Sequence, residues 1–316
     1  MSDQADRLRE LVGASRARAV TALVEDEPEA IAIAPEPDSP RIARSLLFTS
    51  GKGGVGTSNL VLNLAIALGE MGQRVLVVDA DLGLANLDLL CGLTPRYDLG
   101  DVLAGRCELS DAVVKGPGSI QIVPGAHAIR TGSDDLLNGP ARLVAELGEL
   151  ECESDFVLVD AGSGLGPGVA MLAAAADQAV IVSTPEPTSI ADAHAAISRF
   201  RRLAVPPRLR VLVNQATTAA EAIEVLDRLI TSSRQFQGAV VSPLGTGAIR
   251  HDPHVPLAVR GRHPFLKAYP GAIASRGIRR LGRSLVRERQ PPLHKRPAGF
   301  FAAVAARLAL SLVASR

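Results

Sequence analysis

Residues 50–59 constrain the fold of this chain more than any other segment. They read Ser-Gly-Lys-Gly-Gly-Val-Gly-Thr-Ser-Asn and lie between a short apolar run and an amphipathic segment. Gly51 and Gly56 have the G-x-x-x-x-G spacing of a phosphate-binding loop, and Ser58 stands where such a loop carries its magnesium-binding hydroxyl. Glycines let backbone N–H groups approach phosphate oxygens, and the following helix adds the positive end of its dipole. The segment predicts a strand, a nucleotide-binding turn and a helix.

One position departs from this pattern. A loop of this type has lysine directly before the Ser or Thr, and here Thr57 occupies that place. The loss of a charged phosphate contact would cost about the energy of a charge-assisted hydrogen bond or more. Lys52 can still reach a phosphate of its own site or of a second copy, so binding is expected while hydrolysis stays open. The predicted nucleotide-binding residues of the loop are Gly51, Lys52, Gly53, Gly54, Val55, Gly56, Thr57 and Ser58.

Apolar runs rich in Val and Leu alternate with amphipathic segments after the loop. Strands are expected at 46–49, 75–78, 120–123, 156–159, 179–182 and 209–213. Helices are expected at 59–71, 135–150, 167–176, 189–203, 219–236 and 272–287. Short runs that are apolar throughout are typical of parallel strands covered on both faces. The pattern predicts an α/β fold with a doubly wound, mostly parallel sheet and ligands at the carboxyl ends of the strands.

Composition narrows the class further. Hydrophobic residues make up 47% of the 316 positions, but Trp is absent and aromatics are 3%, so Ala, Val, Leu and Ile must build the core. The charged first ten residues do not fit a signal peptide, and no apolar run reaches the ~18 residues of a membrane span. Cys91, Cys107 and Cys152 are widely separated, which predicts reduced thiols in a cytoplasmic protein.

Both ends of the chain lie outside the alternation. The first twenty residues predict a short helix that is marginal alone and therefore docks on another surface. Residues 21–43 contain four prolines, and within them residues 25–38 hold six acidic residues and no basic one, which predicts a disordered linker over 21–43. Residues 250–296 hold twelve Lys or Arg and two acidic residues, either an anion-facing surface or a solvated one. The expected segments are the N-terminal helix at 1–20, the linker at 21–43, the main α/β domain at 44–289 and a C-terminal tail at 290–316.

The loop resembles the deviant Walker A loop of the MinD/ParA family of P-loop ATPases. In that family the early lysine, matched by Lys52, completes the partner's site in an ATP-bound dimer. The family's second lysine is the one that Thr57 replaces. The resemblance implies a MinD-like P-loop fold, ATP and Mg²⁺ as ligands, and a homodimer that forms with ATP.

Three further residues match motifs of that family in the family's order. Asp81, after the strand at 75–78, matches the carboxylate that polarises the attacking water, so the resemblance gives Lys52 and Asp81 as catalytic residues. Asp160 ends a Walker B-like strand and would hold Mg²⁺ together with Ser58. Asn214 resembles the base-contacting Asn of the family.

The N-terminus resembles one branch of the family, the FlhG/FleN regulators of flagellar number. Residues 3–9 read Asp-Gln-Ala-Asp-Arg-Leu-Arg and match the DQAxxLR element of that branch, in which the helix stimulates the signal-recognition-particle-type GTPase FlhF. Residues 184–193 also look like that branch, with Ser189 as the cap of the next helix. The residues that the resemblance assigns to an FlhF-type GTPase are Asp3, Gln4, Ala5, Leu8 and Arg9.

The sequence is also compatible with other functions. Because of Thr57, the chain could be a pseudo-ATPase scaffold that binds nucleotide weakly and acts through its N-terminal helix. The basic 250–296 region suggests a ParA-like DNA-partitioning ATPase, but the N-terminal motif argues against a nucleic-acid partner. Residues 299–315 form either a membrane-targeting helix, which would bring a cytoplasmic protein to the inner face of the cell membrane, or a helix that packs back on the domain. Flagellar C-ring proteins or a transcription factor are further candidate partners.

Overall fold

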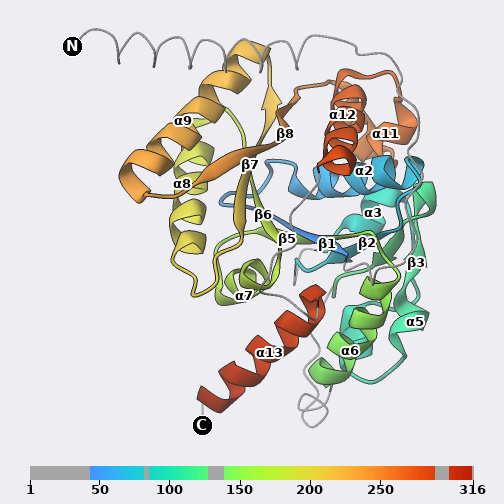
Figure 1. The fold of residues 1–316 in the computed structure, drawn as a ribbon. Helices are drawn as coiled ribbons and strands as arrows, with labels where there is room; N and C mark the ends of the chain where they lie inside the picture. The colour runs from blue at the N-terminus through green and yellow to red at the C-terminus, as the bar shows by residue number, and fades with distance from the viewer. Residues whose placement is uncertain (1–42, 82–84, 127–138, 289–298, 315–316) are drawn as a thin grey trace, which may run out of the picture.

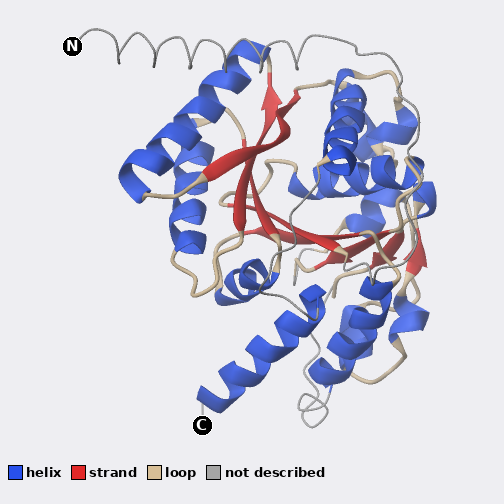
Figure 2. Ribbon diagram, viewed as in Figure 1, coloured by secondary structure: helices blue, strands red, loops and turns tan. Residues whose placement is uncertain are grey.

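A computed structural model describes residues 43–81, 85–126, 139–288 and 299–314. The expected N-terminal helix and acidic linker, and with them the five residues assigned to the GTPase partner, lie outside these ranges. In the described part the chain forms an eight-stranded sheet in the order β3-β4-β2-β5-β1-β6-β7-β8. Among the strand pairs of the described residues, β3–β4 alone is antiparallel. The prediction of a doubly wound, mostly parallel sheet is therefore confirmed (Figures 1 and 2).

The strands are β1 (Arg44–Ser50), β2 (Val75–Asp79), β3 (Val114–Lys115), β4 (Gln121–Val123), β5 (Phe156–Ser163), β6 (Gln178–Ser183), β7 (Arg208–Ala216) and β8 (Val241–Arg250). The longer helices are α2 (Thr57–Glu70), α6 (Gly139–Cys152), α7 (Pro167–Ala175), α8 (Pro187–Arg201), α9 (Ala219–Gln237), α12 (Ile273–Arg287) and α13 (Gly299–Ala314). Short helices are α3 (Leu87–Cys91), α4 (Leu99–Leu103), α5 (Leu109–Ala112), α10 (His254–Arg260) and α11 (Phe265–Ala268), with a 3₁₀ turn at Pro117–Ser119.

Helices cover both faces of the sheet. On one face α2 and α12 pack together, and their apolar sides bury one cluster with β1, β2 and β5. On the other face α6, α7, α8, α9 and the start of α13 bury a second cluster (Figure 1). Each central strand is therefore buried on both sides, which explains why its sequence is apolar throughout and not alternating.

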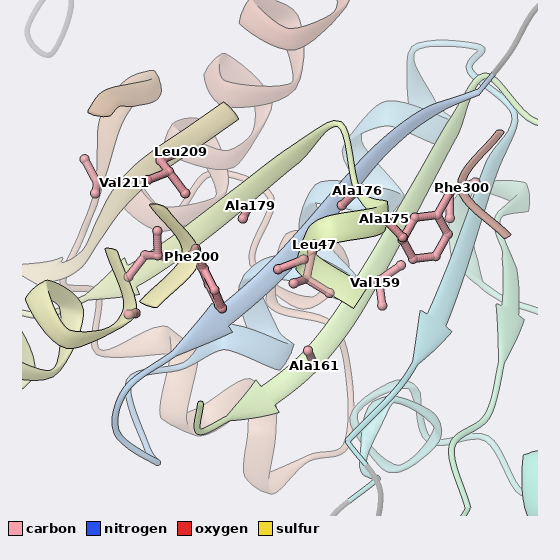
Figure 3. Close-up of a cluster of buried hydrophobic side chains, with 14 of the residues drawn as sticks. Leu47, Val159, Ala161, Ala175, Ala176, Ala179, Phe200, Leu209, Val211 and Phe300 are labelled. Carbon is pink, nitrogen blue, oxygen red and sulfur yellow. The ribbon is translucent and has the colours of Figure 1, made fainter. Parts of the chain in front are cut away.

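Small side chains bring the helices close to the sheet. Ala175, Ala176 and Ala179 are fully buried at the turn from α7 into β6, beside Leu47 of β1 and Val159 of β5 (Figure 3). Since alanine fills little space, α7 can approach the strands closely, and the larger Phe200 and Phe300 fill the remaining volume from α8 and α13. The expectation of an aliphatic and alanine-rich core is confirmed.

The C-terminal helix α13 docks on the domain through its first turns. Phe300 and Phe301 are buried, and their backbone N–H groups donate to the two carboxylate oxygens of Glu151, at 2.6 and 3.0 Å. Gly299, with φ of +85°, leads into this contact. The carboxylate of α6 thus satisfies the N-terminal amides of α13. In the described part of the chain, no helix has both the length and the apolar character to cross a membrane.

Several elements of the fold were not predicted from the sequence. β8 was not predicted, because Pro243, Gly245 and Gly247 interrupt its apolar pattern and both glycines have positive φ. β3 and the short helices were not predicted either. Ser189 does not cap α8: the helix begins at Pro187, and the Ser189 hydroxyl accepts instead from the Thr184 N–H at 3.0 Å. The cap prediction was wrong because the proline starts the helix two residues earlier.

Candidate nucleotide-binding site

The glycine-rich loop joins β1 to α2 at the carboxyl edge of the sheet. Gly54 and Gly56 have φ of +82° and +90°, a region that only glycine adopts without strain, and Gly56 is the N-cap of α2. The Ser50 carbonyl at the start of the loop accepts from the Gly164 N–H at 2.8 Å. The predicted strand, loop and helix are all present, and the loop lies directly beside the segment that follows β5.

Thr57 turns into the domain. Its side chain is buried, with 6% of the residue exposed, and its hydroxyl donates to the Ser50 hydroxyl at 3.2 Å. Ser50 in turn donates to the Lys52 carbonyl at 2.9 Å. The residue that replaces the usual lysine therefore braces the loop from inside. It offers no charge to a ligand.

Lys52 is the one cationic residue of the loop, and its ammonium group is paired within the same chain. It forms an ion pair with Glu186, directly before α8, and lies 3.5 Å from the Thr188 hydroxyl. About half of each side chain is exposed. Glu186 was not identified from the sequence, because 134 positions separate the two residues.

Asp160 lies at the centre of the site. It pairs in register with Phe48 of β1 on one side and Asp79 of β2 on the other, and it is fully buried. One carboxylate oxygen accepts from the Gly162 N–H at 3.0 Å, whereas Oδ2 is buried without a hydrogen-bond partner in the described structure. Burial raises the pKa of Asp160 to about 7, and the nearby Ser58 hydroxyl acts in the opposite direction.

The other two acidic residues have different surroundings. Asp79 is buried and accepts from the N–H groups of Asn86 and Leu87 at 3.0 and 3.1 Å, so it fixes the start of α3. Asp81 is partly exposed and lies over Gly162: a Cβ at that glycine would fall 2.1 Å from the Asp81 carboxylate. Burial raises the pKa of both carboxyls. Asp81 thus lies close to Asp160 and open to solvent, whereas Asp79 has a bracing role that the sequence did not reveal.

Asn214 approaches the loop from the end of β7. Its side-chain amide donates to the Val55 carbonyl at 2.7 Å, and the neighbouring Gln215, with φ of +63°, donates to the same carbonyl at 3.3 Å. A Cβ at Gly56 would lie 2.6 Å from the Asn214 amide nitrogen. The predicted base-contacting residue is therefore next to the loop, and Gln215 is a second contact that was not predicted.

The predicted site residues within the described ranges lie together at this edge. The loop residues 51–58, Asp81, Asp160 and Asn214 come from four segments that are far apart in the sequence. The chemistry of the donor set fits magnesium and phosphate: Ser58 and the unpaired Oδ2 of Asp160 are hard oxygen donors, and the loop offers main-chain N–H groups. Bound Mg²⁺ would neutralise phosphate charge there. Thr57 is the one position that does not fit a loop with a second lysine.

The sheet order, the loop and the buried Asp160 beside Ser58 define the chain as a P-loop nucleotide-binding protein. Residues 43–211 match the family model described as an AAA domain. The antiactivator FleN of Pseudomonas aeruginosa is 37% identical over 230 residues, covering 73% of this chain and 81% of FleN. The flagellum site-determining protein YlxH of Helicobacter pylori is 31% identical over 246 residues, covering 76% of this chain and 81% of YlxH.

A solved structure agrees with these relatives. The septum site-determining protein MinD from Pyrococcus horikoshii, complexed with Mg-ADP, is 26% identical, with a TM-score of 0.61 over 78% of this chain and 96% of that one. The chain belongs to the MinD/ParA family of P-loop ATPases, in the branch that includes FleN and YlxH. The resemblance seen in the sequence is thereby confirmed.

Proposed function

We propose that this protein is an ATP- and Mg²⁺-binding switch that regulates the number or placement of flagella. The names of its relatives FleN and YlxH, an antiactivator and a flagellum site-determining protein, support this role. The observation that carries the nucleotide part is the buried, unpaired Oδ2 of Asp160, whose carboxylate also interacts with Ser58 at the first turn of α2. A buried carboxylate oxygen without a partner is costly unless a ligand completes its coordination.

The residues of this site have separate roles toward the phosphates, the magnesium ion and the attacking water. The N–H groups of residues 53–56 and the positive end of α2 hold the phosphates, and Ser58 with Asp160 holds the magnesium ion. Asp81 accepts a hydrogen bond from water near the terminal phosphate, since its carboxylate is partly exposed and lies above the Asp160 segment. Lys52 contributes positive charge to a phosphate of its own site or of a second copy in an ATP-bound dimer.

Isothermal titration calorimetry tests the nucleotide part. The full-length protein is titrated with ATP in the presence and absence of Mg²⁺. The proposal predicts Mg²⁺-dependent binding that Ser58→Ala weakens by about ten-fold, in line with the loss of a charge-assisted contact. If no heat of association is measured at millimolar ATP and Mg²⁺, the proposal of a nucleotide-binding switch is wrong. Sedimentation velocity with ATP·Mg²⁺ tests for the homodimer.

The proposed partner is an FlhF-type GTPase that contacts Asp3, Gln4, Ala5, Leu8 and Arg9. This part rests on the sequence motif alone. A peptide of residues 1–20 is expected to accelerate GTP hydrolysis by such a GTPase, and Gln4→Ala is expected to reduce the acceleration. A peptide of the same composition in scrambled order is the control. Equal rates with the native and scrambled peptides would remove the GTPase as a partner.

A second candidate function is a pseudo-ATPase scaffold, favoured by the buried, inward-facing Thr57. The two functions differ in turnover, since only a switch that resets itself must hydrolyse ATP. Single-turnover hydrolysis by the wild type separates them: a rate equal to the buffer background, restored by Thr57→Lys, indicates a scaffold.

We further propose a cytoplasmic location with reversible contact to the inner face of the cell membrane through residues 299–315. Phe300 and Phe301 are the aromatic side chains of that helix, and both are buried against α6 and α7. Contact with lipid would therefore require α13 to leave the domain. Co-sedimentation with anionic vesicles, with and without ATP·Mg²⁺, tests this, and a chain ending at residue 298 is the control.

A further inference from the structure

Glu186 and Lys52 meet at the outer face of the phosphate loop. The ammonium group contacts the Glu186 carboxylate, and the Thr188 hydroxyl lies 3.5 Å from it. Lys52 lies in the loop after β1, and Glu186 lies directly before the first turn of α8. The one ammonium group of the loop is therefore paired with a carboxylate of the same chain.

Close packing fixes Glu186 relative to the loop. A Cβ at Gly51 would lie 2.3 Å from the Cβ of Asp192, so the first turns of α8 touch the loop backbone without a side chain between them. The Ser189 hydroxyl accepts from the Thr184 N–H at 3.0 Å and also bonds Ser183, which holds the turn that carries Glu186. The carboxylate is thus presented to Lys52 by two packed segments.

The exposure of the pair sets its strength. The Lys52 and Glu186 side chains are 41% and 61% exposed, so the pair is screened by water and can be broken at little cost. A triphosphate carries several negative charges and can replace a single carboxylate at the same ammonium group. Because Thr57 has replaced the second lysine, Lys52 is the one ammonium group in the loop. A group that pairs with Lys52 therefore has a large effect on phosphate binding.

We propose that Glu186 is a positioning residue that competes with the nucleotide's phosphates for Lys52 and thereby lowers the affinity of this site for ATP. The inference rests on the proposed function, since it requires that ATP binds at this loop. Glu186 acts through Lys52, and it would touch neither the base nor the magnesium ion. Its removal would free the ammonium group and also remove a negative charge that repels the phosphates.

The main test replaces Glu186 by glutamine in the full-length protein and measures ATP·Mg²⁺ binding by calorimetry. The expected result is an affinity about two- to five-fold higher, the range of an exposed ion pair. Glu70→Gln is the matched control. Glu70 is also partly exposed and paired, with Lys267 at 2.7 Å and Arg279 at 3.5 Å, but it lies at the end of α2 that is far from the loop. This control is expected to leave the affinity unchanged.

A double-mutant cycle shows whether Glu186 acts through Lys52. Glu186→Gln is repeated in a Lys52→Ala background, where the gain is expected to shrink to the small effect of the removed charge. A gain of equal size in both backgrounds, an unchanged affinity, or a weaker one in the single variant would each overturn the inference, with the wild type still binding ATP. No binding by the wild type or any variant would overturn the proposed function and this inference together.

Discussion

The hydroxyl of Thr57 donates to the hydroxyl of Ser50 across 3.2 Å, and this bond directs the side chain at position 57 into the domain. The position that usually carries a phosphate-binding lysine thus stabilises the loop itself. Phosphate binding and loop bracing are separate tasks here, and they can be tested separately.

Replacing Thr57 by lysine should strengthen ATP binding and weaken the loop's internal bracing. The ammonium group adds a charge-assisted contact, so we expect the affinity for ATP·Mg²⁺ to rise by about ten-fold or more in calorimetry. Thr57→Val replaces the hydroxyl with a methyl group of similar size and should lower the free energy of unfolding by about 1 kcal/mol in urea denaturation, with little change in affinity. An unchanged affinity in the lysine variant would show that the side chain does not reach the phosphates.

Asp160 should make the protein without Mg²⁺ less stable as the pH rises. Its pKa in the folded state is about 7, above the ordinary value of 3.8, so between these values the folded protein keeps a proton that the unfolded chain has lost. The free energy of unfolding therefore falls from about pH 4 to pH 7. Asp160→Asn should remove this loss and stabilise the protein by about 1–3 kcal/mol at pH 8 in urea denaturation with EDTA.

The matched control for that experiment is Glu153→Gln, the same carboxylate-to-amide change at an exposed position. It should leave the pH dependence as in the wild type. If Asp160→Asn has the same slope as the wild type between pH 5 and pH 8, the carboxyl group does not titrate in this range.

Gly56→Ala should damage the site more than an ordinary glycine substitution. Gly56 has φ of +90°, and an added Cβ would lie 2.6 Å from the Asn214 amide, so backbone strain and a clash add together. Gly72 has a similar φ of +79° but open space around it. Gly72→Ala should cost about 1–2 kcal/mol of unfolding free energy, and Gly56→Ala at least about 1 kcal/mol more, with loss of ATP binding. Equal costs would mean that Asn214 moves aside easily.

Glu151→Ala should loosen the C-terminal helix. It leaves the N–H groups of Phe300 and Phe301 buried and unpaired, so we expect a loss of about 1–3 kcal/mol in urea denaturation, with faster proteolysis after residue 298. Glu149→Ala, at an exposed position of the same helix, should change stability by less than about 0.5 kcal/mol. Similar stability of the two variants would mean that α13 does not depend on this contact.

The sequence was sufficient where local pattern and function coincide. The loop at 50–59 predicted β1 and α2 because a loop with these glycines and Ser58 connects a strand to a helix. Asp160 could be placed because it directly follows an apolar strand, and the carboxyl ends of parallel strands share one edge. The predicted helix at 219–236 is observed at Ala219–Gln237, since its apolar stripe is long and its ends are well marked.

Features that depend on distant partners could not be read from the sequence. Nothing near Glu186 indicates that it meets Lys52, and nothing near Asp79 indicates that it holds the amides of Asn86 and Leu87. β8 was missed because an edge strand tolerates Pro243 and two glycines that a central strand would exclude. In each case the deciding contact comes from tertiary packing.

The contact between Gly51 and Asp192 restricts how this site can move. Any side chain at position 51 would overlap α8, so the loop and the first turns of that helix form a single mechanical unit. Because no side chain separates the two backbones, a displacement of the loop on phosphate binding could not be accommodated by a side-chain rearrangement at position 51. A shift of the loop backbone at Gly51 would instead press directly on α8, whose far end at Arg201 leads into the chain before β7.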